Sequence, residues 1–217
     1  MKILVIAPHP DDETLGCGGT IVKHIVSGDC VTICIVTTAY TPAWSEEFLN
    51  IRNNQVNKAT TILNINRVID LGYHTVKLDT IPQKDISESL SNVVKQVNPD
   101  IVYIPHKGDL HRDHRVIFES SLVALRPVNC NVKRILAYET LSETEWGQPI
   151  EPFMPTSYCD ISETFSKKVE ALKAYKSELR DYPHPRSVEA IEALAKKRGS
   201  EVGFHYAEAF SIIRDVF

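Results

Sequence analysis

The sequence lacks the features that mark secreted, membrane-spanning and nucleic-acid-binding proteins. Its five cysteines form no Cys-x-x-Cys pair and their number is odd, so no disulfide framework is indicated and the cytoplasm is the expected compartment. The first apolar run, residues 3–7, is too short for a signal-peptide core or a membrane span. A net charge of −4 argues against nucleic acid or an anionic membrane as a partner.

Repeats and low-complexity tracts are also missing, and 217 residues suffice for one α/β domain, which we expect to span residues 1–217. Short apolar runs, each typical of a buried strand, alternate with segments of helical periodicity. The predicted strands are residues 3–7, 31–37, 68–71, 101–104 and 132–138, with a short one near residue 158. The predicted helices are residues 14–27, 46–63, 87–97, 116–125, 162–179 and 188–198. This alternation predicts a mostly parallel sheet with helices on both faces, which binds ligands beyond the carboxyl ends of its strands.

The first unusual polar segment is APHPDDE at residues 7–13, directly after the first predicted strand. Its prolines stiffen the loop, and neighbouring carboxylates repel each other unless a cation or hydrogen-bond donors compensate them. A divalent metal would bind one carboxylate and leave its neighbour free to act as a base. A second interpretation stays open, because Asp11, Asp12 and Glu13 would also favour the positive end of a helix dipole.

The second polar segment is HKGDLHRDH at residues 106–114, directly after the fourth predicted strand. Three His and two Asp within nine residues are a density of metal-ligating side chains that a solvated loop does not need. Both segments follow strands of the same parallel sheet, so we expect them to meet at one edge. Together they offer two imidazoles and one carboxylate, a set typical of catalytic zinc sites that keep a position open for water. The residues therefore predict metal-assisted hydrolysis, without naming the bond that is cleaved.

With these two segments the sequence resembles the PIG-L/LmbE family of zinc-dependent N-acetylglucosaminyl deacetylases. Residues 7–19 match the first family signature, (A/P)HPDDE before a glycine-rich helix start, and HRDH at residues 111–114 matches the second, HxDH. Weaker matches are found at residues 52–63, 71–73, 198–199 and 206–210. The resemblance spans nearly the whole chain. It implies a Rossmann-like three-layer α/β/α sandwich with its active site at the C-terminal strand ends, and it is compatible with a homo-oligomer.

The resemblance also implies a role for individual residues. The implied metal ligands are His9, Asp12 and His114. Asp11 would be the general base that activates water, and His111 would be the electrophilic or acid partner, oriented by Asp113. Arg52 would contact substrate hydroxyls. The implied reaction removes an N-acetyl group from an N-acetylglucosamine-type sugar or glycoconjugate, with Zn²⁺ as cofactor. The same ligand types also suit Fe²⁺, Co²⁺ or Mn²⁺.

Departures from the family pattern concern the sugar rather than the metal. Gln55 stands where family members often carry Glu, Asn64 where Gly is frequent, and HT at residues 74–75 where Pro-Asp is common. A substrate-contacting carboxylate is therefore missing or is replaced, with Asp79 as a candidate. The proline-stiffened segment PHPR, residues 183–186, brings the His184 imidazole as a candidate substrate contact, together with the Arg186 guanidinium, and these groups could meet sugar hydroxyls, a phosphate or a carboxylate. A rigid surface connection between helices is the equal alternative.

Three other functions were weighed against deacetylation. The glycines at residues 16–19 do not predict a dinucleotide site, because they follow the first strand by about nine residues and no acidic residue closes the second strand. An amidase that cleaves a thiol-sugar S-conjugate would share both family signatures. A metal- or sugar-binding protein without catalysis would need neither Asp11 nor His111.

Overall fold

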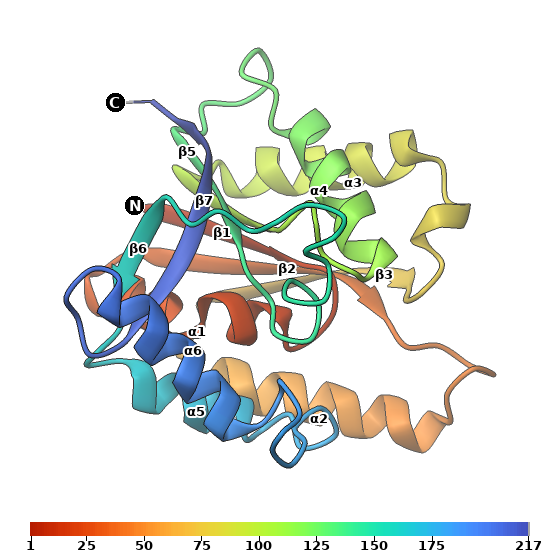
Figure 1. The fold of residues 1–217 in the computed structure, drawn as a ribbon. Coiled ribbons are helices and arrows are strands. Elements are labelled where there is room, and N and C mark those ends of the chain that lie inside the picture. The colour runs from red at the N-terminus through yellow and green to blue at the C-terminus, as the bar shows by residue number, and fades with distance from the viewer. Residues whose placement is uncertain (217) are drawn as a thin grey trace.

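Strands and helices alternate along the chain (Figure 1), as the apolar pattern predicts. The computed structural model describes residues 1–216, so the last residue of the predicted domain, 217, lies outside the described part. The strands are β1 (Lys2–Ala7), β2 (Cys30–Thr38), β3 (Arg67–His74), β4 (Ile101–Pro105), β5 (Arg134–Tyr138), β6 (Ser157–Asp160) and β7 (Ala207–Asp215). The helices are α1 (Asp12–Val26), α2 (Glu46–Ile62), α3 (Gln83–Val97), α4 (Arg112–Ala124), α5 (Phe165–Leu172) and α6 (Val188–Ser200), with a 3₁₀ turn η1 (Leu78–Thr80).

The described strands form one sheet in the order β3-β2-β1-β4-β5-β7-β6. β1 to β5 pair in parallel, and β7 is antiparallel to both of its neighbours. From β1 the chain proceeds to β2 and β3 on one side and then crosses to β4 on the other. The boundary between β1 and β4 is therefore the switch point at which doubly wound sheets bind ligands.

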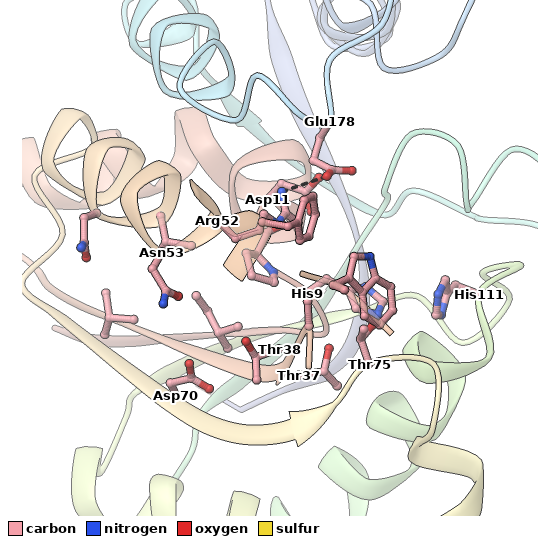
Figure 2. A pocket seen from close by; sticks show the side chains of 18 of the residues that line it. His9, Asp11, Thr37, Thr38, Arg52, Asn53, Asp70, Thr75, His111 and Glu178 are labelled. Atoms are coloured by element: carbon pink, nitrogen blue, oxygen red, sulfur yellow. Dashed lines mark hydrogen bonds and ion pairs between the residues drawn. The ribbon is translucent and has the colours of Figure 1, made fainter. Parts of the chain in front are cut away.

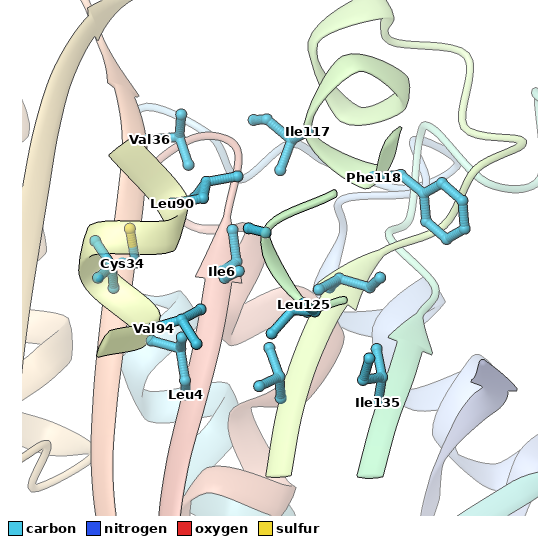
Figure 3. Close-up of a cluster of buried hydrophobic side chains, with 14 of the residues drawn as sticks. Leu4, Ile6, Cys34, Val36, Leu90, Val94, Ile117, Phe118, Leu125 and Ile135 are labelled. Carbon is cyan, nitrogen blue, oxygen red and sulfur yellow. The ribbon is translucent and has the colours of Figure 1, made fainter. Parts of the chain in front are cut away.

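Helices cover both faces of the sheet (Figure 1), which confirms the predicted mostly parallel three-layer α/β/α sandwich. Side chains alternate between the faces along β1, as expected of a strand buried on both sides. Leu4 and Ile6 pack with residues of α3 and α4 (Figure 3), whereas Ile3 and Val5 pack with residues of α1, α2 and α5. No helix within residues 1–216 combines the length and apolar character needed to cross a bilayer.

The C-terminal third differs from the sequence prediction in two places. The predicted helix over residues 162–179 is helical only within α5. After α5 the chain turns, and the side chain of Tyr175 is buried. β7 was not predicted, because the charged Glu208 interrupts its apolar run. In the structure Glu208 is buried and pairs with Lys168 Nζ at 2.6 Å, and it accepts the Gly19 and Thr20 N–H groups of α1. A buried carboxylate is tolerated when it is paired and hydrogen-bonded in this way.

Candidate active site

The two polar segments found in the sequence meet at the switch point of the sheet. Residues 8–13 follow β1 and residues 106–114 follow β4, and these strands are parallel neighbours. Both segments therefore leave the sheet at its carboxyl edge. His9 Nδ1 and His114 Nε2, from residues 105 positions apart in the sequence, lie 3.3 Å apart.

The three side chains predicted as metal ligands converge on one point. Asp12 Oδ2 lies 3.2 Å from His9 Nδ1 and 3.2 Å from His114 Nε2. Asp12 and His114 are buried, and His9 is partly buried at the wall of a cleft. Two imidazole nitrogens and a carboxylate oxygen thus form a compact group of the kind that binds a divalent cation.

A carboxylate contacts the outer ring nitrogen of each imidazole in this group. Asp113 Oδ2 lies 3.1 Å from His9 Nε2, and Asp109 Oδ2 lies 2.8 Å from His114 Nδ1. Asp109 is itself oriented by the Thr144 hydroxyl, which donates to its Oδ1 at 2.6 Å. A carboxylate on the outer nitrogen fixes the tautomer of a metal-binding histidine and makes its inner nitrogen more basic.

The electrostatics of the group also fit a cation. Within residues 1–216, Asp12 Oδ1 is buried and has no hydrogen-bond partner. Burial by itself would raise the pKa of Asp12, but His114 and His9 hold it well below its ordinary value. Burial by itself would lower the pKa of His114, but Asp12 and Asp109 raise it well above its ordinary value. Positive charge is thus favourable beside Asp12 and Asp109, and a divalent ion such as Zn²⁺, Fe²⁺, Co²⁺ or Mn²⁺ would supply it on this donor set.

A second set of possible ligands, His9, His111 and Asp113, shares one histidine with the first. Its carboxylate is already engaged by the backbone. The Val76 N–H donates to Asp113 Oδ2 at 2.7 Å, and the Leu78 N–H donates to Oδ1 at 3.4 Å. Asp12 has an unpartnered buried oxygen instead, so His9, Asp12 and His114 are the better candidate metal site.

His111 caps the N-terminus of α4 and lines the cleft beside His9, with their ring centroids 4.5 Å apart. Its Nδ1 accepts the backbone N–H of Asp113 at 3.2 Å, so Asp113 orients it through the backbone while the Asp113 carboxylate contacts His9. Burial, followed by the nearby imidazoles, lowers the pKa of His111 to about 4. The ring is neutral near pH 7, and because Nδ1 accepts, Nε2 carries the hydrogen.

Asp11 occupies a strained position at the start of α1. It is the N-cap residue and its φ of 108° lies in the left-handed region, which costs a non-glycine residue about 1–2 kcal/mol. Glu13 stabilises this turn, because its Oε2 accepts the Asp11 N–H at 3.0 Å. The Tyr175 hydroxyl in turn donates to Glu13 Oε1 at 2.7 Å. Glu13, the third carboxylate of the APHPDDE segment, therefore stabilises the backbone conformation of Asp11.

The Asp11 side chain faces Arg186 of the proline-stiffened segment, a contact that the sequence did not predict. Asp11 is 2% exposed, and its Oδ2 lies 3.1 Å from Arg186 Nη1. Burial raises the pKa of Asp11 to about 7, although Arg186 opposes the shift. Arg186 also contacts Glu178 at 3.1 Å, Glu143 at 3.5 Å and the Ser142 hydroxyl at 2.7 Å. One guanidinium thus holds Asp11 and two further acidic side chains in place.

A cleft of about 620 Å³ opens beside these residues (Figure 2). His9 and His111 lie at one end, and Asn53 and Asp70 lie at the other, across a face of β2 and β3. Its volume is in the range of small-molecule sites. The predicted replacement carboxylate, Asp79, lies in η1 and is not part of the cleft wall, whereas Asp70 is.

The two predicted substrate contacts occupy different positions. Arg52 lines the cleft, but its guanidinium already pairs with Glu178 Oε1 at 3.0 Å and donates to the Pro10 carbonyl at 2.7 Å. His184 is not part of the cleft wall, and its Nδ1 accepts the Arg186 N–H at 3.0 Å. Substrate contact by either residue stays a prediction.

Sequence reasoning gave no role to Asp109, Glu143 and Glu178, and it did not predict that Arg186 contacts Asp11. Asp109 carried a signal, because it lies five residues before His114 in the same polar segment. Arg186 lies in the proline-stiffened segment from which His184 was chosen. Glu143 and Glu178 lie in regions predicted as a loop and a helix end, where no local pattern distinguishes them.

The sheet topology and this cluster define a class of protein, an α/β protein with a candidate two-histidine, one-carboxylate metal centre at its switch point. Residues 4–125 match the family model described as PIG-L, GlcNAc-PI de-N-acetylase. The chain belongs to this PIG-L family of deacetylases.

Individual relatives agree with this assignment. The uncharacterized deacetylase YaiS of Escherichia coli K12 is 30% identical over 181 residues, covering 81% of this chain and 90% of the relative. The probable N-acetyl-alpha-D-glucosaminyl L-malate deacetylase 2 of Bacillus anthracis is 27% identical over 185 residues, covering 81% and 80%. The crystal structure of the conserved protein TT1542 from Thermus thermophilus superimposes with a TM-score of 0.81 at 27% identity, covering 100% of this chain and 96% of that one.

Proposed function

We propose that this protein hydrolyses the N-acetyl group of an N-acetylglucosamine-type sugar or glycoconjugate in a metal-dependent reaction. The observation that carries the proposal is the convergence of His9, Asp12 and His114 on one point beside the buried Asp11, at the end of a cleft lined by His111. The relatives named as deacetylases support the same reaction. We extend the proposal to residues 1–217 as one catalytic domain.

His9, Asp12 and His114 would hold the ion, and Zn²⁺ is the proposed occupant. When bound there, the ion would supply Lewis-acid polarisation of the amide carbonyl and would make water a better nucleophile. Asp109 and Asp113 keep the two imidazoles oriented through their outer nitrogens, at 2.8 and 3.1 Å.

Asp11 and His111 would carry the proton transfer and the stabilisation of charge. The Asp11 carboxylate accepts a proton from water as the water oxygen bonds to the amide carbon. The neutral His111 ring donates its Nε2–H to the carbonyl oxygen, where negative charge develops. The C–N bond then breaks, and the proton held by Asp11 passes to the leaving nitrogen. The products are acetate and a primary amine.

Arg186 would act as a positioning residue for Asp11. Its guanidinium bridges Asp11 to Glu178 and Glu143, which come from two other parts of the chain. Arginine suits this role because its planar guanidinium group can donate several hydrogen bonds at once. Arg186 thereby keeps the Asp11 carboxylate aimed at the cleft.

Replacing Arg186 with alanine should lower kcat for acetate release by about 10²-fold, because a displacement of roughly 1 Å at a reacting group can cost that much. KM should change far less. Arg186→Lys keeps the positive charge but loses the planar guanidinium group, so it should retain part of the activity. Guanidinium added to the solution should restore part of the lost activity of Arg186→Ala. Arg180→Ala is the control, because Arg180 is an exposed arginine of the same connection. Wild-type kcat in Arg186→Ala would contradict the positioning role.

The proposed function is tested by measuring metal content together with acetate release from N-acetylglucosamine and its conjugates. We expect about one divalent ion per chain, acetate release from at least one conjugate, and loss of activity with chelator that added Zn²⁺ restores. Bound metal without acetate from any conjugate would contradict deacetylation. Cleavage of thiol-sugar S-conjugates would then identify an amidase, and no turnover at all would identify a non-catalytic binder.

A further inference from the structure

The two carboxylates that contact the candidate histidine ligands are supported in different ways. Asp113 accepts two backbone N–H groups, at 2.7 and 3.4 Å. The Asp109 carboxylate accepts no backbone N–H within residues 1–216, and besides His114 it contacts the Thr144 hydroxyl, at 2.6 Å. A side-chain substitution can therefore remove the support of Asp109 but not that of Asp113.

The hydrogen bonds at Thr144 run in one direction. The Thr140 backbone N–H donates to Thr144 Oγ1 at 2.7 Å, and the Thr144 hydroxyl donates its hydrogen to Asp109 Oδ1 at 2.6 Å. The other carboxylate oxygen, Asp109 Oδ2, lies 2.8 Å from His114 Nδ1. A carboxylate in this position accepts Nδ1–H, which leaves the lone pair of Nε2 free for an ion. One chain of hydrogen bonds thus leads from a loop to a ligand atom of the candidate metal site.

This chain of hydrogen bonds is shielded from water. Asp109 is fully buried, and Thr144 and His114 are 4% and 1% exposed. In such surroundings neighbouring hydrogen bonds strengthen one another, and a buried carboxylate oxygen that loses its donor finds no water to replace it. Removing the Thr144 hydroxyl would leave Asp109 Oδ1 without a donor and would free the carboxylate to turn away from His114.

The loop that carries Thr144 packs closely against the HKGDLHRDH segment. It connects β5 to β6, and its Glu143 carbonyl accepts the Leu110 N–H at 3.0 Å. A Cβ atom on Gly147 would lie 1.9 Å from the Gly108 carbonyl oxygen, so this approach of two backbones requires glycine. Backbone contacts on both sides of Thr144 therefore fix the position of its hydroxyl.

We infer that Thr144 is a positioning residue for the metal ion. Its hydroxyl holds the Asp109 carboxylate against His114 and thereby raises the affinity of the site for a divalent ion. This inference rests on the proposed metal site of His9, Asp12 and His114. Thr144 belongs neither to this group of ligands nor to the wall of the cleft, so its substitution acts on metal binding rather than on contacts with the substrate.

Removing the hydroxyl while keeping the shape of the side chain tests the inference. Thr144→Val should weaken Zn²⁺ binding by about tenfold, the lower end of the loss expected when the support of a metal ligand is removed. Thr144→Ser keeps the hydroxyl, so it should bind Zn²⁺ as tightly as the wild type although it loses a buried methyl group. The dissociation constant is measured on the metal-free protein by competition with a chelating dye, at a temperature at which circular dichroism shows each variant to be folded.

Thr140→Val is the matched control. Thr140 is a fully buried threonine of the same loop, and within residues 1–216 its own hydroxyl has no hydrogen-bond partner. The substitution leaves its backbone N–H in place for Thr144, so the affinity for Zn²⁺ should stay at the wild-type value. Equal affinity in Thr144→Val and Thr140→Val would overturn the inference and leave the metal site standing. A wild-type protein that binds no Zn²⁺ would overturn both.

A double-substitution cycle tests whether Thr144 acts through Asp109. In the Asp109→Asn background, Thr144→Val should change the Zn²⁺ dissociation constant by less than about twofold, because the carboxylate that the hydroxyl supports is already gone. Thr144→Ala removes the hydroxyl without placing a methyl group against Asp109, and it should weaken binding as Thr144→Val does. An undiminished tenfold effect in the Asp109→Asn background would contradict the inferred route from Thr144 to the ion.

Discussion

Asp11→Ala should lower kcat for acetate release by about 10²–10⁴-fold and leave the metal content unchanged, because a general base contributes rate enhancement of that order. The candidate metal group consists of His9, Asp12 and His114, and Asp11 is not part of it. Asp11 instead faces Arg186 at 3.1 Å, and Arg186 keeps its contacts with Glu178 and Glu143 when Asp11 is removed. Initial rates of acetate release and elemental analysis of the purified variant give the two values.

Asp11→Asn is the matched control for this prediction. An asparagine keeps the size of the side chain and can still accept from Arg186, but it cannot take up a proton. The asparagine variant should therefore be as inactive as Asp11→Ala while unfolding at a temperature close to that of the wild type. Near-wild-type turnover in either variant would show that another group removes the proton. Loss of metal in Asp11→Asn would show that Asp11 is a ligand.

His114→Ala should lose both the bound metal and acetate release. The substitution removes one of the two imidazole nitrogens from the candidate metal group. It also leaves the Asp109 carboxylate without the imidazole that lies 2.8 Å away. Breaking a buried pair of this kind costs roughly 3–5 kcal/mol, so the free energy of unfolding should also fall. Metal content, activity and chemical denaturation are measured on the same preparation.

His106→Ala separates loss of metal from loss of stability. His106 is a buried histidine at the start of the same segment, but its Nε2 contacts the Glu151 carbonyl oxygen at 3.2 Å. Its ring packs on Phe153 at right angles, 5.2 Å between centroids. The His106 variant should be destabilised and still bind metal. Retention of metal in His114→Ala would exclude His114 as a ligand.

The parts of the fold that could be predicted are those in which local and tertiary preferences agree. Strands β1 and β4 contain continuous apolar runs, and β2 is mostly apolar, because helices cover both faces of these strands. That burial is visible in the sequence. β7 could not be recognised, because the buried Glu208 is stabilised by Lys168 from α5, 40 residues earlier. The residue at which α5 ends could not be predicted either, because Tyr175 lies beyond the helix, where its hydroxyl donates to the Glu13 carboxylate.

The candidate site could also be predicted only in part. Its candidate metal ligands lie in two short segments, and the strand pattern alone predicted that these segments share one sheet edge. The partner of Asp11 could not be predicted in this way. Arg186 is 175 residues away in the sequence, and several other arginines of the chain could have taken its place. The partners in a long-range ion pair depend on the path that the loops take in the folded chain. Local sequence periodicity does not determine that path.

By itself, the sequence determined the parallel part of the sheet, the edge of the sheet at which the candidate site lies, and the residue types available there. Apolar runs and clustered histidines and carboxylates are local properties, and the parallel topology brings them together with little freedom. Only the tertiary structure decided that Asp113 supports His9, that Arg186 contacts Asp11, and that Arg52 and Arg186 are paired within the cleft. Charge partners are chosen by distance in space, so the electrostatics of the cleft emerge only when the chain has folded.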